Sequence, residues 1–158
     1  MGHQNFGFVG EAHTEREFEL FRNTAARCGV AIHPKFVSVN DYRFYDCGYY
    51  GIDEMLKKDS LPSVVYAAYS HIAVGILQRL NEAQIRVPDD VSLVCLNDIS
   101  GVPYGNLQVS CIKMQLEELC SESIHLLYRL LSKHHSVSKH TITVERQFAP
   151  GETISKLK

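Results

Sequence analysis

The stretch Ile85-Arg86-Val87-Pro88-Asp89-Asp90-Val91-Ser92-Leu93-Val94-Cys95-Leu96-Asn97-Asp98 decides the fold class of this chain. Pro88 cannot continue a helix, so we expect it to end the preceding one. The residues from Val91 to Leu96 are apolar except for Ser92, which is typical of a central parallel strand that is covered on both faces. In an open parallel sheet, ligands bind beyond the carboxyl ends of the strands. Asn97 and Asp98 are therefore candidates for a small-molecule site in a doubly wound α/β domain.

The length and composition are those of one ordinary globular domain. The chain has 158 residues, of which 45% are hydrophobic and 22% are charged, enough to bury a core. A net charge of -2 supplies no field that would hold nucleic acid, so this stretch itself is not expected to bind DNA. No apolar run predicts a membrane span, and the start does not resemble a signal peptide. The five cysteines form no C-x-x-C pair and are expected to be buried or half-buried cytosolic thiols.

Strands and helices are expected to alternate along the chain. Strands are predicted at residues 5–9, 36–39, 63–68, 91–96, 109–112 and 141–148, and helices at residues 14–28, 46 to about 57, 70 to about 84, and about 115–133. Thr14 and Glu17 have the spacing of a capping box, and Gly29 would close the first helix. The alternation implies right-handed β-α-β units and a parallel sheet.

In order and spacing, these segments resemble LacI/GalR-family bacterial transcription regulators over most of the chain. The resemblance rests on Gly2-His3 before the first strand, residues 62–68, Ile72-Ala73-Val74-Gly75, the stretch quoted above and the helix after Ile112. The effector domain of that family is similar to a periplasmic sugar-binding protein. The resemblance therefore implies a doubly wound parallel sheet in a type I periplasmic-binding-protein-like lobe, with an incomplete second lobe.

The resemblance also implies an effector site between two lobes, where polar side chains at strand ends hold a sugar. Asn97 and Asp98 match the polar pair after the signature strand, although Asn and Asp also cap turns. Arg16 lies near the family's sugar-binding arginine, but a count back from Gly29 places Glu17 there. The alternative for this pair is a solvated helix surface.

A stacked aromatic ring is expected beside the sugar. The family often places it where this chain has Arg43, which is flanked by Tyr42 and Phe44. Either ring could stack on a sugar face, and packing of the loop is the alternative for both.

Two departures from the family pattern make the predicted site more apolar. Tyr69 and Ser70 follow the third strand, where the family typically has Asn-Asp. Tyr69 can donate one hydrogen bond and offer a ring but cannot clamp two hydroxyls, while Ser70 is expected to keep the helix-capping role. Met114 stands where a polar residue often reaches the ligand. These changes predict a specificity different from that of simple hexose repressors, or loss of effector binding.

The helix predicted at about 115–133 carries an apolar stripe that one lobe does not bury. The stripe consists of Leu116, Leu119, Cys120, Ile124, Leu127, Leu130 and Leu131. In the resembled family this helix crosses into the N-terminal lobe, which we expect to be absent here together with the helix-turn-helix headpiece. Residues 1–158 would then be the C-terminal part of an effector-binding domain, with one lobe over about 3–112 and 141–158. An exposed stripe should drive dimerisation, swapping or aggregation, unless the helix folds back onto the lobe.

The function implied by the resemblance is sugar sensing and dimerisation in a cytoplasmic transcription regulator. Lobe closure around the sugar would change the placement of DNA-binding heads in a homodimer, and operator DNA would be contacted only through the absent headpiece. The alternatives are a periplasmic sugar-binding protein of an ABC transporter and a receptor-like module fused to another output.

No catalytic group, cofactor or metal site is expected from the sequence. His134, His135 and His140 lie in a polar connection without a carboxylate at ligand spacing, so a solvated loop is the better interpretation. Ser70 and His71 are adjacent in a helix and point in different directions, which makes a poor nucleophile–base pair. An enzyme is therefore the least favoured class.

Overall fold

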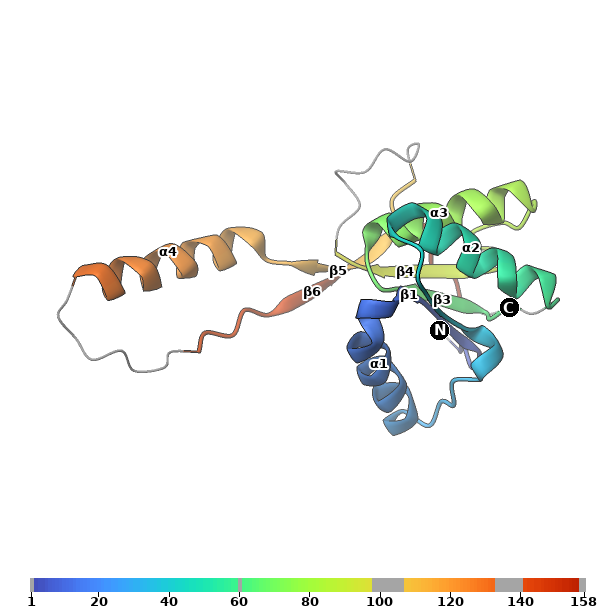
Figure 1. The fold of residues 1–158 in the computed structure, drawn as a ribbon, viewed down its shortest axis with the longest axis horizontal. Coiled ribbons are helices and arrows are strands. Elements are labelled where there is room, and N and C mark those ends of the chain that lie inside the picture. The colour runs from blue at the N-terminus through green and yellow to red at the C-terminus, as the bar shows by residue number, and fades with distance from the viewer. Residues whose placement is uncertain (1, 60, 98–106, 133–140, 157–158) are drawn as a thin grey trace.

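The computed structural model describes residues 2–59, 61–97, 107–132 and 141–156, and its centre is one six-stranded sheet. The strands are β1 Phe6–Glu11, β2 Val37–Asn40, β3 Val64–Ala67, β4 Ser92–Leu96, β5 Ser110–Met114 and β6 Arg146–Ala149. The helices are α1 Glu15–Arg27, α2 Phe44–Lys57, α3 Ser70–Glu82 and α4 Leu116–Ser132, with short 3-10 turns at Ala12–Thr14 and Pro34–Phe36. Figure 1 shows α2 and α3 on one face of the sheet and α1 on the other.

The strand order is β2-β1-β3-β4-β5-β6. Strands β1 to β5 are parallel, and this parallel direction is the part that the sequence predicts. The expectation of a wholly parallel sheet is wrong at one edge, because β6 pairs antiparallel with β5, with Met114 opposite Arg146. The chain leaves β5 at the carboxyl edge and returns to that same edge, so β6 has to run backwards. The result is a doubly wound α/β sheet with one antiparallel edge strand.

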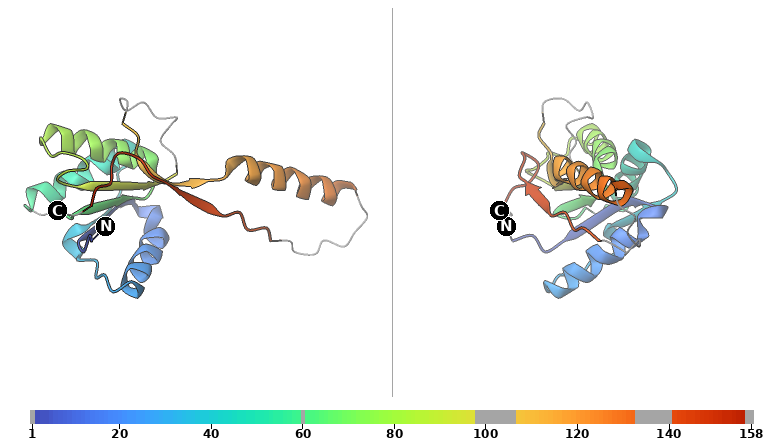
Figure 2. Two further views of the ribbon diagram at one scale, coloured as in Figure 1. Left: turned by 180° about the vertical axis from the view of Figure 1, so that it is seen from behind. Right: turned by 90° about the vertical axis from the view of Figure 1, so that its left-hand side faces the viewer.

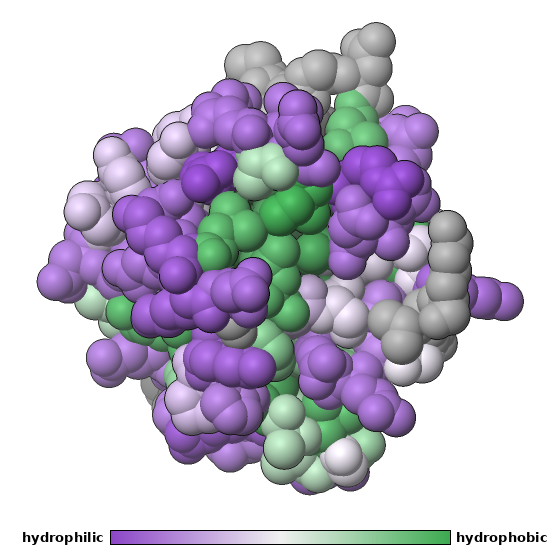
Figure 3. Space-filling model, turned by 90° about the vertical axis from the view of Figure 1, so that its right-hand side faces the viewer, coloured by the Kyte–Doolittle hydropathy of each residue, from purple (hydrophilic) through white to green (hydrophobic). Residues whose placement is uncertain are grey.

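The core lies between the sheet and the layer formed by α2 and α3. Val9, Val65 and Leu93 are fully buried there, as the apolar strands predict. The backbones of α2 and α3 touch, since a Cβ added at Gly48 would stand 2.0 Å from the carbonyl oxygen of Ile72. Figure 3, seen from the side away from α4, shows hydrophobic residues between hydrophilic flanks. None of the helices in the described ranges is long and apolar enough to cross a membrane.

Neither predicted N-cap makes a capping hydrogen bond, although Thr14 does occupy the N-cap position of α1. The Thr14 side chain donates to the carbonyl oxygen of Glu11 at 2.8 Å and makes no capping bond to α1, because a 3-10 turn precedes that helix. The capping box with Glu17 is therefore not formed. Ser70 is the first residue of α3 and not its cap, and Tyr69 in the N-cap position makes no side-chain bond to the helix. The start of α3 thus lacks a capping side chain.

One predicted helix end is confirmed and the other is wrong. Gly29 has a left-handed backbone, with φ 77°, and its N–H bonds to the carbonyl oxygen of Ala26, which closes α1. Pro88 does not end α3, because the helix stops at Glu82. Gln84 adopts φ 59° there and supplies the left-handed turn that Gly29 supplies for α1.

Helix α4 stands away from the rest of the molecule. It extends beyond the carboxyl edge of β5, and Figures 1 and 2 show it clear of the sheet and of the other helices. None of its described residues is buried, and the exposed side chains include Leu116, Leu127 and Leu131. The alternative in which this helix folds back onto the sheet is therefore wrong, and the predicted stripe is exposed.

The cysteines differ in exposure. Cys28 and Cys120 are exposed, so the expectation of buried or half-buried thiols is wrong for these two. Cys47 is buried under α3, and burial, followed by the charge of Glu11, raises the pKa of its thiol to about 12.

Thiol labelling is expected to separate these classes. Iodoacetamide at pH 8 should modify Cys28 and Cys120 in the folded protein and all five cysteines in urea, because the thiolate is the reactive species. At that pH the raised pKa keeps the Cys47 thiol almost entirely protonated. Peptide mass spectrometry measures the labelling, and rapid labelling of Cys47 without urea would contradict its buried position.

Candidate functional site

The parallel register places a row of polar residues at the carboxyl edge of the sheet. One residue from each of β1, β3, β4 and β5 lies in the same register: Val9, Ala67, Cys95 and Cys111. The residues two positions further along these four segments are Glu11, Tyr69, Asn97 and Lys113. On β2, Asn40 pairs with Glu11. Because the strands are adjacent and parallel, these residues occupy neighbouring positions at the edge where doubly wound sheets bind ligands.

Glu11 is the buried carboxylate of this edge. Its side chain is 1% exposed, and Oε1 accepts a hydrogen bond of 2.7 Å from the backbone N–H of Phe44. Oε2 lies 2.9 Å from Nε of Arg43 and 3.1 Å from Nδ1 of His13. One carboxylate therefore ties the end of β1 to the start of α2, where Phe44 has a left-handed φ of 53°.

Sequence reasoning missed Glu11, although a signal was present. Glu11 directly follows an apolar strand, as Asn97 does, so the strand-end argument applies to both. What the sequence does not show is the pairing with Arg43 and Phe44, which are more than thirty positions away.

Three rings lie around Tyr69 at this edge. The ring centroid of Tyr69 lies 6.2 Å from that of Phe44, and 6.5 Å from those of both His13 and His71. Phe44 also lies 5.7 Å from His71, and the guanidinium carbon of Arg43 lies 4.9 Å from the centre of the Phe44 ring. The Tyr69 hydroxyl is buried and has no hydrogen-bond partner among the described residues. The edge thus combines ring faces with a polar atom that a ligand can satisfy.

Asn97 offers a second unsatisfied polar atom. Its backbone has φ 67°, and its N–H donates to the carbonyl oxygen of Ile112 at 3.0 Å, which fastens the end of β4 to β5. Its side-chain Oδ1 is buried and has no partner within the described ranges. A left-handed backbone is common for Asn in turns, so the residue shapes the turn and still presents a free acceptor. Asp98 lies outside the described residues.

The other predicted site residues lie apart from the rings. Arg16 is exposed in the first turn of α1. Tyr42 packs on Tyr50 at 4.4 Å between ring centroids, so Phe44, not Tyr42, is the ring that lies beside Tyr69. Glu17, the alternative to Arg16, lines a separate apolar groove on the α1 face of the sheet.

The chemistry available at this edge is non-covalent recognition. It offers an acceptor at Asn97, a hydroxyl at Tyr69 and ring faces at Phe44 and the two histidines. Glu11 fixes Phe44 and His13 within this set. In the part of the chain that the structure describes, no group of three or more His, Cys, Asp or Glu side chains could hold a metal ion. Polar groups beyond the carboxyl ends of a doubly wound sheet define a small-molecule-binding domain of the periplasmic-binding-protein type.

Comparisons with known proteins support this class. The family described as periplasmic binding protein-like domain matches residues 1–154. The HTH-type transcriptional regulator GanR of Bacillus subtilis is 30% identical over 141 residues, which cover 80% of this chain and 41% of GanR. The ribose operon repressor of Haemophilus influenzae is 24% identical over 161 residues, which cover 99% of this chain and 48% of the repressor. The chain spans less than half the length of these two relatives.

Solved structures show the same fold. A sugar-binding transcriptional regulator of the LacI family from Escherichia coli matches with a TM-score of 0.77 and 24% identity, over 97% of this chain and 55% of that one. The regulator CelR in complex with cellobiose matches with a TM-score of 0.80 and 19% identity, over 96% of this chain and 47% of that one. The chain belongs to the periplasmic binding protein-like domains of the LacI/GalR family, and the predicted resemblance is confirmed. These relatives are transcription regulators, so nothing here supports the transport-receptor alternative.

Proposed function

We propose that this chain is the effector-binding lobe of a cytoplasmic LacI/GalR-type transcription regulator and that its effector is a sugar. One observation carries the proposal: the carboxyl edge holds two buried polar atoms, the Tyr69 hydroxyl and Asn97 Oδ1, that have no partner among the described residues. Buried polar groups are normally hydrogen-bonded. A sugar hydroxyl both donates and accepts, so one hydroxyl-rich ligand satisfies Asn97 and Tyr69 together. The regulator names of the relatives point to the same class.

The proposed mechanism is closure of two lobes around the effector. The sugar lies on the edge of this lobe, with Phe44 against its apolar face, and a facing lobe covers it. Binding energy that is gained only in the closed form shifts the equilibrium toward closure. In a homodimer this shift changes the placement of DNA-binding headpieces, through which operator DNA is contacted. Glu11 touches no ligand in this scheme and acts as a positioning residue for Phe44 and Arg43.

The proposed domain organisation has one lobe over about residues 3–112 and 141–158, with α4 reaching toward the facing lobe. It is supported by the path of the chain, which leaves the sheet from β5 and returns on β6 at the edge that holds the polar row. Two of the remaining proposed site residues, Arg16 and Tyr42, would add contacts at the rim, and Asp98 stays a proposed site residue on the sequence alone.

Substitution of Asn97 tests the site. Asn97→Gly retains a left-handed backbone and removes the carboxamide, whereas Asn97→Ala also strains the turn. Both variants should bind sugar about tenfold more weakly, because one hydrogen bond to the ligand is lost, and the Gly variant should keep its unfolding free energy within about 1 kcal/mol. Isothermal calorimetry with a panel of pentoses, hexoses and disaccharides, including ribose and cellobiose, measures the affinity.

The panel also tests the function itself. A wild-type chain that binds no sugar of the panel would contradict the proposed function. A wild type that binds, with unchanged affinity in Asn97→Gly, would contradict only the role of Asn97. Asn81→Gly on the far end of α3 serves as the matched control, since it removes the same side chain away from the carboxyl edge.

A further inference from the structure

The carboxyl edge of the sheet has an aromatic half and a polar half. Phe44 is tied to the end of β1 by its hydrogen bond to Glu11. Tyr69 follows β3, and Asn97 follows β4. Since β1, β3 and β4 are neighbours in the sheet, Phe44, Tyr69 and Asn97 follow one another in that order along the edge. Rings therefore occupy the part over β1 and β3, and the buried acceptor Oδ1 of Asn97 lies over β4.

The rings of Phe44, Tyr69 and His71, which we call the ring corner, stand steeply to one another. The angle between ring planes is 72° for Phe44 and Tyr69, 63° for Tyr69 and His71, and 61° for Phe44 and His71. Phe44 is 49% exposed, so much of its ring surface is open to a ligand. A flat aromatic group that stacks on one of these rings meets another at its edge, and both arrangements are favourable between aromatic rings.

A simple sugar would use only part of the ring corner. Its one apolar face stacks on one ring, and its hydroxyls need hydrogen-bonding partners that the remaining ring faces do not offer. The LacI/GalR pattern typically has Asn-Asp after the third strand, where this chain has Tyr69 and Ser70. This exchange removes a carboxamide and a carboxylate and adds a ring and a small hydroxyl. The edge has thus lost groups that hold sugar hydroxyls and gained a surface for an aromatic group.

The charges beside the ring corner favour an uncharged ligand group. The guanidinium of Arg43 lies against Phe44, but the buried carboxylate of Glu11 offsets its charge, with Oε2 2.9 Å from Nε of Arg43. The same oxygen lies 3.1 Å from Nδ1 of His13. A phosphate or carboxylate on the ligand would meet the Glu11 charge as well as the cation, whereas a neutral ring meets neither as a charge.

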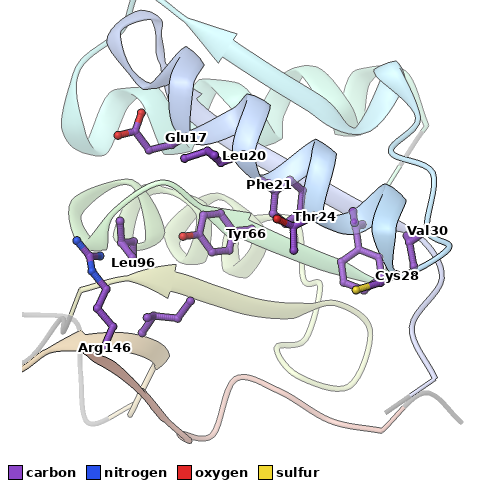
Figure 4. Close-up of a pocket in the computed structure, with 12 residues that line it drawn as sticks. Glu17, Leu20, Phe21, Thr24, Cys28, Val30, Tyr66, Leu96 and Arg146 are labelled. Carbon is purple, nitrogen blue, oxygen red and sulfur yellow. The ribbon is translucent and has the colours of Figure 1, made fainter. Parts of the chain in front are cut away.

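The apolar groove on the α1 face is a different kind of surface. Figure 4 shows it between α1 and the strands, with Glu17 and Arg146 at one end. Its rings cover each other, since Phe21 and Tyr66 are stacked at 26°. In the described part of the chain, none of the residues that line this groove holds a buried polar atom without a partner. The edge combines rings with such atoms and the groove does not, so a ligand with an aromatic and a polar part fits the edge.

We infer that the effector is an aryl glycoside, an inference that rests on the proposed function. Its sugar hydroxyls bind Asn97 and the Tyr69 hydroxyl, and its aryl ring lies in the ring corner. Phe44, which would meet the apolar face of a simple sugar, then faces the aryl ring. Neighbouring strands are about 4.8 Å apart, so the sugar and the aryl ring lie about one strand spacing apart, which a single glycosidic oxygen can span. Tyr69 contacts both parts and is the specificity-determining residue.

Matched glycosides test the inference. Isothermal calorimetry compares the phenyl and the methyl glycoside of the same sugar and anomer, for glucose, galactose and ribose. The two members of a pair differ only in the group on the glycosidic oxygen. For a sugar that binds, the phenyl glycoside should bind at least about tenfold more tightly than the methyl glycoside, because it alone fills the ring corner.

Two variants should abolish this preference. Phe44→Leu removes the exposed ring, and Tyr69→Asn replaces the second ring by the residue type that the family has there. In each variant the ratio of the two affinities should fall to about threefold or less. The methyl glycoside should keep its affinity within about threefold in Tyr69→Asn, since Asn still hydrogen-bonds a hydroxyl.

Phe148→Leu is the matched control for Phe44→Leu. Phe148 is 52% exposed, close to the value for Phe44, and it lies on β6, three strands away from β3 in the sheet. The control should leave the ratio of affinities unchanged. Saturation-transfer NMR adds a readout on the ligand itself: the phenyl protons should receive the strongest saturation in the wild type and lose it relative to the sugar protons in Phe44→Leu. Circular dichroism checks that each variant is folded.

The outcomes separate the two proposals. Equal affinities for the phenyl and the methyl glycoside in the wild type would overturn the aryl group and leave sugar binding standing. A preference for phenyl that persists in both Phe44→Leu and Tyr69→Asn would overturn the ring corner as its site. Tighter binding of a hexose 6-phosphate than of the phenyl glycoside would overturn the uncharged ligand. If no glycoside and no sugar of the panel binds, the proposed function fails, and the aryl glycoside fails with it.

Discussion

Gly75→Ala is expected to destabilise the protein by about 3 kcal/mol, because overpacking in a rigid contact costs this much when the neighbours are backbone atoms. The added Cβ would stand 2.0 Å from the carbonyl oxygen of Tyr45 and 2.8 Å from the backbone nitrogen of Tyr49. Neither atom can rotate away, so α2 and α3 have to separate and loosen the core beneath them. Urea unfolding followed by circular dichroism measures the free energy of unfolding.

Gly29→Ala is the matched control for this prediction. It adds the same methyl group, and nothing lies within 4 Å of it, although its φ of 77° makes the backbone conformation unfavourable for Ala. The expected cost is about 1 kcal/mol, from the left-handed conformation alone. Gly48→Ala should behave like Gly75→Ala, because its Cβ meets Ile72 across the same helix contact.

The double variant Gly48→Ala with Gly75→Ala provides a sharper check. Both glycines lie in the contact between α2 and α3, so a separation of the helices that accommodates the first Cβ also makes room for the second. The double variant should therefore lose clearly less unfolding free energy than the sum of the losses in the two single variants. If Gly75→Ala costs no more than Gly29→Ala, the close approach of α2 and α3 is wrong.

Glu11→Ala is expected to weaken sugar binding at least about tenfold and to destabilise the fold by about 2 kcal/mol, because it leaves the partly buried Phe44 N–H without its acceptor. The ion pairs add little to stability, since Arg43 and His13 are 62% and 58% exposed and solvent screens them. They do hold Arg43 and Phe44 in one arrangement, and without Glu11 the ring beside Tyr69 is no longer fixed. Calorimetry with the sugar panel and urea unfolding measure the two effects.

Two further variants separate the charge of Glu11 from its hydrogen bond. Glu11→Gln retains an oxygen that can accept from Phe44 and loses the ion pairs, so it should keep most of the stability and part of the affinity. Glu15→Ala removes a carboxylate of the same charge from the exposed first turn of α1 and should change neither quantity by more than experimental error. Wild-type affinity in Glu11→Ala would remove the positioning role.

Much of the sheet and part of the site are predictable from local patterns. The apolar run through Leu93 and the polar residues that follow it predict a buried parallel strand with a ligand-binding end. The structure has the buried strand, and the ligand-binding end stays a prediction. Asn97 could be proposed in this way because it directly follows the strand in the sequence. Local capping rules were less successful: Thr14 bonds back to Glu11, and α3 ends at Glu82, six residues before Pro88. Several side chains and turns can satisfy a helix end, and the choice depends on neighbouring backbone that is distant in sequence.

The amino-acid sequence by itself determined the α/β class, the parallel direction of the first five strands, the family and the apolar stripe of α4. Each of these follows from periodicity or from residues that lie next to one another along the chain. Only the tertiary structure decided the antiparallel return of β6, the role of Glu11, the ring that lies beside Tyr69 and the vacant groove under α1. These depend on contacts between segments far apart in sequence, whose partners are set by sheet register and helix packing and leave no local pattern to read.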